Sequence, residues 1–409
     1  MKKFIYILIF FNVYLAGCNT EADVAPGESG TFVKFFGNIN SDVAEDMKTT
    51  TDGGFIFLSS NRTELTEIEI DKIHLVKTDA FGNIEWERLY PEEEGIPASE
   101  EESINLTGRS LLALEDGYIV VGDSIYDEES SNLYIMRTAL DGNLLNEASL
   151  SIPGGNLKGR VIELTQEGGF IVLGQIENSA APENMYLAML NANLDVIWEQ
   201  QYGIGDEANV SRSFHVGEQE ITWAGTTIRN PGEQDIRFIS TPFDSKNTFF
   251  DESVGLNNGR NDIGADIKRC PTGYVIVGTT NDTENGDNDM FLISISTAGN
   301  VLWSETFGGS GNDTGESVMV TSRNEIVALG TTESFGNGER DMYLVKTDLS
   351  GNAIWTDTPG EGRTFGGVND EAGSRVLETA DNGYLLLGTE DFNDVGTMIL
   401  IKTDQDGNL

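Results

Sequence analysis

Seven acidic residues in three polar stretches supply the kind of oxygen atoms with which proteins bind cations, hydroxyl groups or basic surfaces. The stretches cover residues 281–289 (NDTENGDND), 308–316 (GGSGNDTGE) and 334–341 (SFGNGERD). The candidate binding residues are Asp282, Glu284, Asp287, Asp289, Asp313, Glu339 and Asp341. Ca²⁺ prefers such ligands, but an EF-hand loop that begins at Asp282 or Asn285 lacks the glycine required at its sixth position. We therefore favour hydrogen-bonded turns and solvated loops, expect no cofactor, and keep calcium as the alternative.

The sequence has few histidine and cysteine residues from which a catalytic site could be built. The histidines are His74 and His215, and neither is a sequence neighbour of Cys270, so a Cys–His nucleophile is not favoured. Two scattered histidines also leave little with which to build a zinc site or a Ser-His-Asp triad. His74 aligns with aromatic residues of other repeats, which favours a packing role. Carboxylates are abundant, so a paired-carboxylate hydrolase remains an alternative to the expectation that the protein has no catalytic residues.

The N-terminal sequence predicts an export signal followed by a flexible tether. Two lysines precede an apolar run, residues 4–15, that is too short for a membrane-spanning helix. The run ends in Leu-Ala-Gly-Cys at residues 15–18, which resembles the lipobox of bacterial lipoproteins. The resemblance implies that residues 1–17 are removed, that Cys18 carries lipid, and, because Asn19 is not the aspartate of the inner-membrane sorting rule, that the anchor lies in the outer membrane. An ordinary cleaved signal is the alternative. Residues 18–30 are small, polar and acidic, as in a flexible tether.

The charge of the chain is strongly negative, with 25 basic and 68 acidic residues and a formal net charge of −43. Such a field repels nucleic acid and anionic lipid surfaces, so neither is an expected partner. It suits solubility above all, and also basic protein surfaces or cations.

Seven copies of a unit of about 50 residues account for most of the chain. A short apolar run recurs at residues 55–60, 118–124, 170–176, 221–227, 274–280, 326–332 and 384–390. Each run contains a glycine at the same place, or Ser59 in the first copy, and four successive intervals between these positions are 52, 51, 53 and 52 residues. A repeat of this length marks a repeat architecture and overrides a division into domains by length alone.

Each copy reads as four antiparallel strands. In the sixth copy these are ESVMVTS (316–322), the apolar run, DMYLVKTD (341–348) and AIW (353–355), with Gly and Asn in the tight turns. The second strand is apolar at nearly every position, which indicates that both of its faces are covered. One such sheet cannot bury both faces alone, whereas seven can bury them against one another in a ring. The sequence therefore predicts an all-β, seven-bladed β-propeller over residues 31–409.

The two ends of the chain complete one another. The last copy stops at Leu409, two residues before its expected tryptophan. Residues 32–37 (FVKFFG) have the spacing of residues 303–308 (WSETFG), which places Phe32 at a tryptophan position. We expect a strand at about 31–37 to finish the last blade and close the ring, leaving no open joint.

The repeat pattern F-G-G…N-D-x-G…E-I-V-A-L-G-T-T…D-M-Y-L-V-K-T-D…G-N-x-x-W resembles short propeller repeats of secreted and surface lipoproteins of Bacteroidota-type bacteria. Copies two and four depart from it, with Asn146 and with Phe249 or Phe250 at the tryptophan position. The recurring tryptophans are expected to pack blade against blade, and Trp223 to fill core: Trp86, Trp198, Trp303 and Trp355. The recurring acidic residues near the crossovers are expected to cap local turns: Asp42, Asp262, Asp313 and Asp370.

The favoured function is a non-catalytic binding or scaffold module. In propellers the face that carries the loops between second and third strands, with the channel mouth, is the usual binding surface. We expect a protein or glycan partner on this acidic loop face, a membrane anchor through lipid at Cys18, and a monomer. The alternatives are a carboxylate-dependent hydrolase of extracellular polymers and a scaffold in outer-membrane assembly, because the fold alone does not decide function.

Overall fold

A computed structural model describes residues 30–37, 40–65, 68–91, 105–127, 130–178, 181–203, 207–218, 220–230, 233–242, 250–254, 261–281 and 288–409. The predicted signal peptide, Cys18 and most of the predicted tether lie outside these residues, as does Phe249. Within them, no helix has the length and apolarity needed to cross a membrane.

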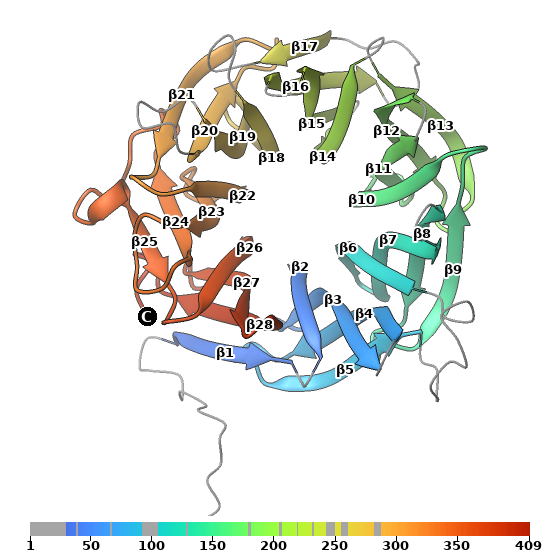
Figure 1. Cartoon of the computed structure of the whole chain (residues 1–409), viewed down its shortest axis with the longest axis horizontal. Coiled ribbons are helices and arrows are strands. Elements are labelled where there is room, and N and C mark those ends of the chain that lie inside the picture. The colour runs from blue at the N-terminus through green and yellow to red at the C-terminus, as the bar shows by residue number, and fades with distance from the viewer. Residues whose placement is uncertain are drawn as a thin grey trace, which may run out of the picture.

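Seven four-stranded antiparallel sheets form a ring around a central channel, which confirms the predicted seven-bladed propeller (Figure 1). Six blades are built from consecutive strands. They are β2 (Ser41–Thr49), β3 (Phe55–Leu65), β4 (Ile68–Thr78) and β5 (Ile84–Tyr90); β6 (Asn105–Leu114), β7 (Gly117–Asp127), β8 (Ser130–Thr138) and β9 (Leu144–Leu150); β10 (Asn156–Leu164), β11 (Phe170–Asn178), β12 (Ala181–Leu190) and β13 (Val196–Tyr202); β14 (Ala208–Val216), β15 (Glu220–Asn230), β16 (Glu233–Pro242) and β17 (Phe250–Val254); β18 (Asp262–Cys270), β19 (Gly273–Thr280), β20 (Asp289–Ile295) and β21 (Val301–Phe307); and β22 (Asp313–Val320), β23 (Ile326–Thr332), β24 (Asp341–Thr347) and β25 (Gly362–Phe365).

The seventh blade joins the two ends of the chain, as the sequence predicts. It contains β26 (Asp370–Glu378), β27 (Tyr384–Phe392), β28 (Val395–Thr403) and, as its outer strand, β1 (Phe32–Phe36). The β1–β28 register runs from Phe32 opposite Lys402 to Phe36 opposite Met398 (Figure 1). Closure through hydrogen bonds between the first and last strands leaves no free edge at the ring joint.

Contacts in the outer layer confirm that Phe32 occupies a tryptophan position. Its ring lies against Gly82, in the last tight turn of the next blade, in the way that Trp86 lies against Gly142. The Trp86 Nε1 also donates to the Leu140 carbonyl at 3.1 Å, so these two outer aromatic residues pack against the tight turn of the neighbouring blade. Only glycine leaves room for the ring at these turns, and its positive φ suits the turn geometry.

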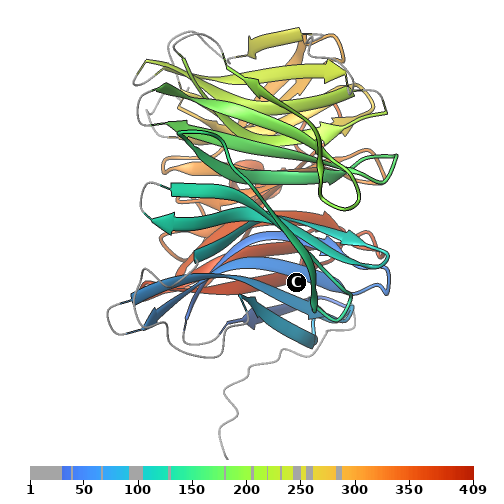
Figure 2. The same cartoon turned by 90° about the vertical axis from the view of Figure 1, so that its right-hand side faces the viewer.

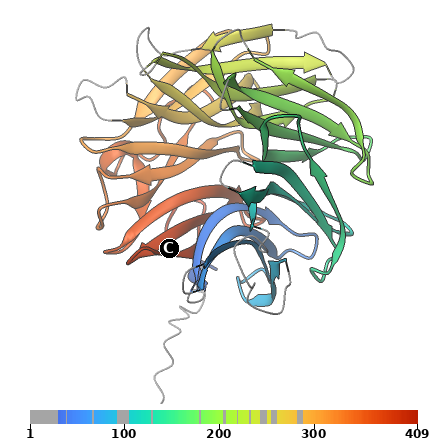
Figure 3. The same ribbon diagram turned by 45° about the vertical axis from the view of Figure 1, so that its right-hand side comes forward.

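The hydrophobic core lies between blades and not within them. Figures 2 and 3 show the sheets stacked face against face around the ring. Val275 and Val277 of one blade, for example, pack in one cluster with Val318, Ala328 and Tyr343 of the next. This arrangement explains the uninterrupted apolar runs, because each second strand is covered on both faces.

The fourth strand of the sixth blade is displaced from its predicted position at residues 353–355. Ala353 makes only an isolated bridge to Thr347, and the strand that pairs with β24 is β25, after a 3₁₀ turn at Pro359–Glu361. In the fifth blade the outer strand runs without interruption from Trp303 to Phe307. Between Trp355 and the corresponding Phe365 the chain has six additional residues, which form this turn and delay the strand.

Candidate functional site

The acidic residues singled out in the sequence lie in different environments. Asp282, Glu284 and Asp287 lie outside the described residues, and Glu339 is exposed. Asp289, Asp313 and Asp341 are buried. Asp313 Oδ2 accepts hydrogen bonds from Gly309 N (2.8 Å) and Ser334 Oγ (2.7 Å), and Asp341 Oδ2 accepts from the backbone of residues 337 and 338 (3.0 and 3.1 Å). These two carboxylates therefore hold their own loops. The described residues contain no group of three or more His, Cys, Asp or Glu side chains placed to hold a metal ion.

The acidic residues that recur near the crossovers also bind within their own blades. Asp42 Oδ1 accepts from Ser59 Oγ at 2.8 Å, and Asp262 Oδ1 accepts from Thr280 Oγ1 at 2.6 Å. In the seventh blade the equivalent residue is Glu371 and not Asp370, because Glu371 lies opposite the second strand at the corresponding place. Asp370 instead pairs with Arg340 at 3.1 Å.

Glu371 and Asp341 face each other across Gly366. A Cβ atom at Gly366 would contact both Glu371 Oε2 and Asp341 Oδ1. Burial raises the pKa of Glu371 to about 7, and the negative charges of Glu390 and Asp341 contribute to this rise. The hydrogen bond from the Gly367 N–H acts in the opposite direction and lowers the pKa. At neutral pH Glu371 is therefore partly protonated.

The remaining candidates for chemistry have packing roles. His74 is buried, with Nδ1 2.9 Å from Asp42 Oδ1. Trp223 is buried, as expected, and its Nε1 donates to Met185 Sδ at 3.2 Å. Cys270 is a buried free thiol 3.2 Å from the Thr272 hydroxyl.

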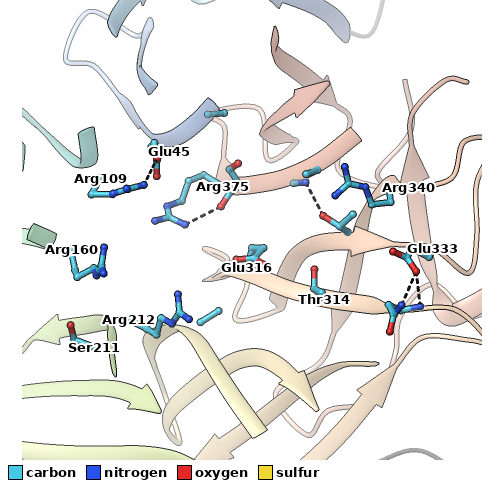
Figure 4. A pocket seen from close by; sticks show the side chains of 17 residues that line it. Glu45, Arg109, Arg160, Ser211, Arg212, Thr314, Glu316, Glu333, Arg340 and Arg375 are labelled. Carbon is cyan, nitrogen blue, oxygen red and sulfur yellow. Dashed lines mark hydrogen bonds and ion pairs between the residues drawn. The ribbon is translucent and has the colours of Figure 1, made fainter. Parts of the chain in front are cut away.

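Every innermost strand carries one β-bulge, and all seven bulges lie at the same height in the ring. The extra residues are Glu45, Arg109, Arg160, Arg212, Ala265, Glu316 and Ser374. A bulge adds a residue outside the regular alternation and can re-aim its side chain. All seven line a cavity of about 640 Å³ in the channel, at the mouth bordered by Asn312, Glu333 and Arg340 of the loop face (Figure 4).

A small residue precedes each bulge because the neighbouring blade approaches closely there. A Cβ atom at Gly108 would lie 2.5 Å from Leu58 Cδ1, and one at Gly373 would lie 2.5 Å from the Gly330 carbonyl oxygen. The other blades have Ala44, Gly159, Ser211, Gly264 and Gly315 at this place. Close packing between blades therefore favours a small residue before the bulge, most strictly at Gly108 and Gly373.

Arginines dominate the charge of this cavity. Arg109 donates to Glu45 Oε1 at 2.7 Å, Arg375 Nε lies 3.3 Å from Asp46 Oδ1, and Arg340 pairs with Asp370. Figure 4 shows Arg109, Arg160 and Arg212 in an arc along one side, with Arg375 reaching inward from β26.

Burial shifts the ionisation of the groups in the cavity. Burial lowers the pKa of Arg160, and the positive charges of Arg109 and Arg212 lower it further. The negative charges of Asp123 and Glu177 raise it but do not offset this lowering. Burial raises the pKa of Glu45 despite Arg109, and raises the pKa of Glu316 despite Arg375 and Arg212. Burial thus disfavours the charged forms of Arg160, Glu45 and Glu316, and the channel holds several arginines close together.

A second cavity of about 310 Å³ lies deeper in the channel, below the bulges. Here Asp46 Oδ2 accepts from Leu111 N at 2.8 Å, and Asp266 Oδ2 accepts from Val318 N at 3.1 Å. Each of these carboxylates ties its blade to the next one, so this layer is structural.

The channel arginines were not identified from the sequence. The signal is present, because Arg109, Arg160 and Arg212 are 51 and 52 residues apart, at the period of the repeat, and each follows a small residue. An alignment of the first strands of all copies would have exposed it.

Comparison with known proteins supports the fold and no more. Neither a protein-family model nor a curated protein sequence matches the chain. Among solved structures, a Trypanosoma rangeli sialidase in complex with the inhibitor DANA aligns with a TM-score of 0.50 at 12% identity, over 90% of this chain and 59% of the sialidase. YCF48 from Cyanidioschyzon merolae aligns with a TM-score of 0.50 at 13% identity, over 91% of this chain and 99% of YCF48. This chain thus matches about three-fifths of the sialidase, and at such identity the likeness concerns the propeller architecture alone.

Proposed function

We propose that this protein is a non-catalytic binding module of the cell envelope, anchored in the outer membrane by lipid at Cys18, and that a glycan binds in its central channel. One observation carries the proposal: all seven blades aim their bulge residue into one open cavity on the loop face. A strand without a bulge keeps its side chains in regular alternation. A bulge turns one side chain out of this alternation, and bulges are common where a side chain is re-aimed toward a ligand.

The size and lining of the cavity support a glycan. Its volume of about 640 Å³ lies within the usual range of ligand pockets. Asn312, Thr314 and Ser374 contribute hydroxyl and amide groups to its wall, and the glutamates there can accept hydrogen bonds. Such a wall matches a ligand that is rich in hydroxyl groups.

A channel-blocking variant tests the proposal. Ala265 has the smallest of the seven bulge side chains, so Ala265→Trp would put a bulky indole ring into the cavity. Leu302→Trp is the control, because Leu302 lies exposed on the outer strand β21. On an array of extracellular polysaccharides, wild type and Leu302→Trp are expected to bind the same glycans, and Ala265→Trp to bind none. Equal binding by Ala265→Trp would place the site elsewhere, and release of new reducing ends from a bound glycan would favour the hydrolase.

A further inference from the structure

The charge balance of the channel mouth is opposite to that of the chain. Basic residues are outnumbered 25 to 68 in the whole sequence. The wall of the 640 Å³ cavity has five arginines, at positions 109, 160, 212, 340 and 375, and three glutamates, at positions 45, 316 and 333. This local excess of positive charge lies inside an otherwise acidic surface, which indicates a site for a negatively charged group.

Among the described residues, two of these arginines make no hydrogen bond to a carboxylate. Arg160 Nη2 lies 3.7 Å from Glu177 Oε1, and that glutamate is already paired with Lys158 at 2.6 Å. Arg212 has no hydrogen bond or ion pair with any residue in the described part of the chain. The two come from adjacent blades, at the same bulge position, and both point into the cavity (Figure 4).

Repulsion between neighbouring arginines opposes this arrangement. Arg109 and Arg212 both disfavour the charged form of Arg160, although Asp123 and Glu177 favour it. An anion between Arg160 and Arg212 would replace repulsion by charge-assisted hydrogen bonds, which are stronger than neutral ones.

We propose that Arg160 and Arg212 bind the carboxylate of an acidic sugar, with Arg109, held by Glu45, beside them. This assignment rests on the proposed function and names the class of ligand. The guanidinium fork matches a carboxylate in a bidentate manner, which an ammonium group cannot do. Glu45, Glu316 and Glu333 then stand as acceptors for the sugar hydroxyls.

The overall charge of the protein restricts how many carboxylates the ligand carries. A net charge of −43 repels a polyanion at long range, whereas a single carboxylate on a neutral chain meets little repulsion before it reaches the arginines. We therefore assign to the site a largely neutral glycan with isolated uronate residues. An acidic peptide or a polyuronate is disfavoured by the same field.

Calorimetric titration with two matched oligosaccharides tests the assignment. The probes are xylotetraose that carries one glucuronate branch and the same xylotetraose without the branch. Wild type is expected to bind the branched probe and to bind the neutral one about 10- to 100-fold more weakly, as for the loss of a charge-assisted contact. Higher salt should weaken binding of the branched probe only.

Substitutions of Arg160 and Arg212 test whether these two residues bind the carboxylate. Arg160→Ala and Arg212→Ala are each expected to weaken binding of the branched probe about 10- to 100-fold and to leave the neutral probe unaffected. The double lysine variant, Arg160→Lys with Arg212→Lys, keeps the charge but loses the fork, and is expected to remain about 10-fold weaker than wild type. Arg323→Ala, on the surface at a tight turn, is the control. Melting temperatures of all variants verify folding.

Several results would overturn the assignment. If both probes bind equally and the arginine variants change nothing, while Ala265→Trp abolishes binding, the proposed function holds and the carboxylate site is wrong. If neither probe binds, the sugar assignment fails, and failure on the polysaccharide array as well would reject the proposed function. If a triglutamate peptide binds in preference to the branched sugar, the ligand is a protein.

Discussion

Closure of the ring by β1 gives the sharpest test of the fold, through Phe36→Ala compared with Phe35→Ala. Phe36 is 4% exposed and its ring centroid lies 5.3 Å from that of Phe57 in the first blade, whereas the adjacent Phe35 is 53% exposed. Both residues lie on β1 and are paired with β28, so the two variants change the same strand by the same number of atoms. Only the Phe36 variant removes core between the seventh and first blades.

The magnitudes follow from burial. Truncation of a buried phenylalanine costs about 3–5 kcal/mol, whereas a surface substitution stays within about 0.5 kcal/mol. Because domains are stabilised by only about 5–15 kcal/mol, Phe36→Ala should remove a large part of the total.

Urea unfolding, followed by tryptophan fluorescence, measures the difference. The midpoint is expected to fall clearly for Phe36→Ala, with an unchanged slope, and to stay near wild type for Phe35→Ala. Equal midpoints for the two variants would refute the claim that β1 is an integral part of the seventh blade. Deletion of residues 31–37 should be more damaging than either substitution, because it opens the ring.

Three further predictions concern ionisation, packing and anchoring. The pKa of Glu371 is about 7 in the folded protein and 4.5 for an ordinary glutamate, so the folded state holds more protons between these pH values and stability falls as pH rises through them. Glu371→Gln should therefore be the more stable protein at pH 8, by at most about 3 kcal/mol. Urea midpoints that respond to pH alike in both proteins would contradict this. Gly373→Ala should cost about 1–3 kcal/mol in thermal unfolding, because its Cβ would press on the Gly330 carbonyl, whereas Gly367→Ala, with its nearest contact at 3.6 Å, should be tolerated. Cys18→Ser should move the protein from the membrane fraction to the soluble fraction of expressing cells, and retention on membranes would argue against the lipid anchor.

The ring could be predicted from the sequence because the same pattern of apolar residues recurs in the corresponding strand of each blade. The apolar run at residues 326–332 is buried throughout, as expected for a strand covered on both faces. The match of Phe32 to the outer tryptophans also identified the closing strand. The displaced strand β25 could not be predicted, because the insertion before Phe365 breaks the repeat phase on which the prediction depended.

The candidate site was harder to predict from the sequence than the fold. Carboxylates such as Asp313 and Asp341 look like ligands in a sequence, and only the structure shows that loop N–H and hydroxyl groups donate to the Oδ2 atom of each. Arg160 and Arg212 lie in strands whose alternation does not reveal a bulge, and their charges converge only when the blades close into a ring. The bulge decides which side chain enters the channel, and in the sequence it is marked only by the recurrence of a small residue before it at the period of the repeat.

The most direct test of the account is a crystal structure of the protein with the glucuronate-branched xylotetraose bound. The account predicts density in the channel mouth, with the glucuronate carboxylate within hydrogen-bonding distance of the guanidinium groups of both Arg160 and Arg212. Sugar density elsewhere on the protein, with no contact to either arginine, would contradict it.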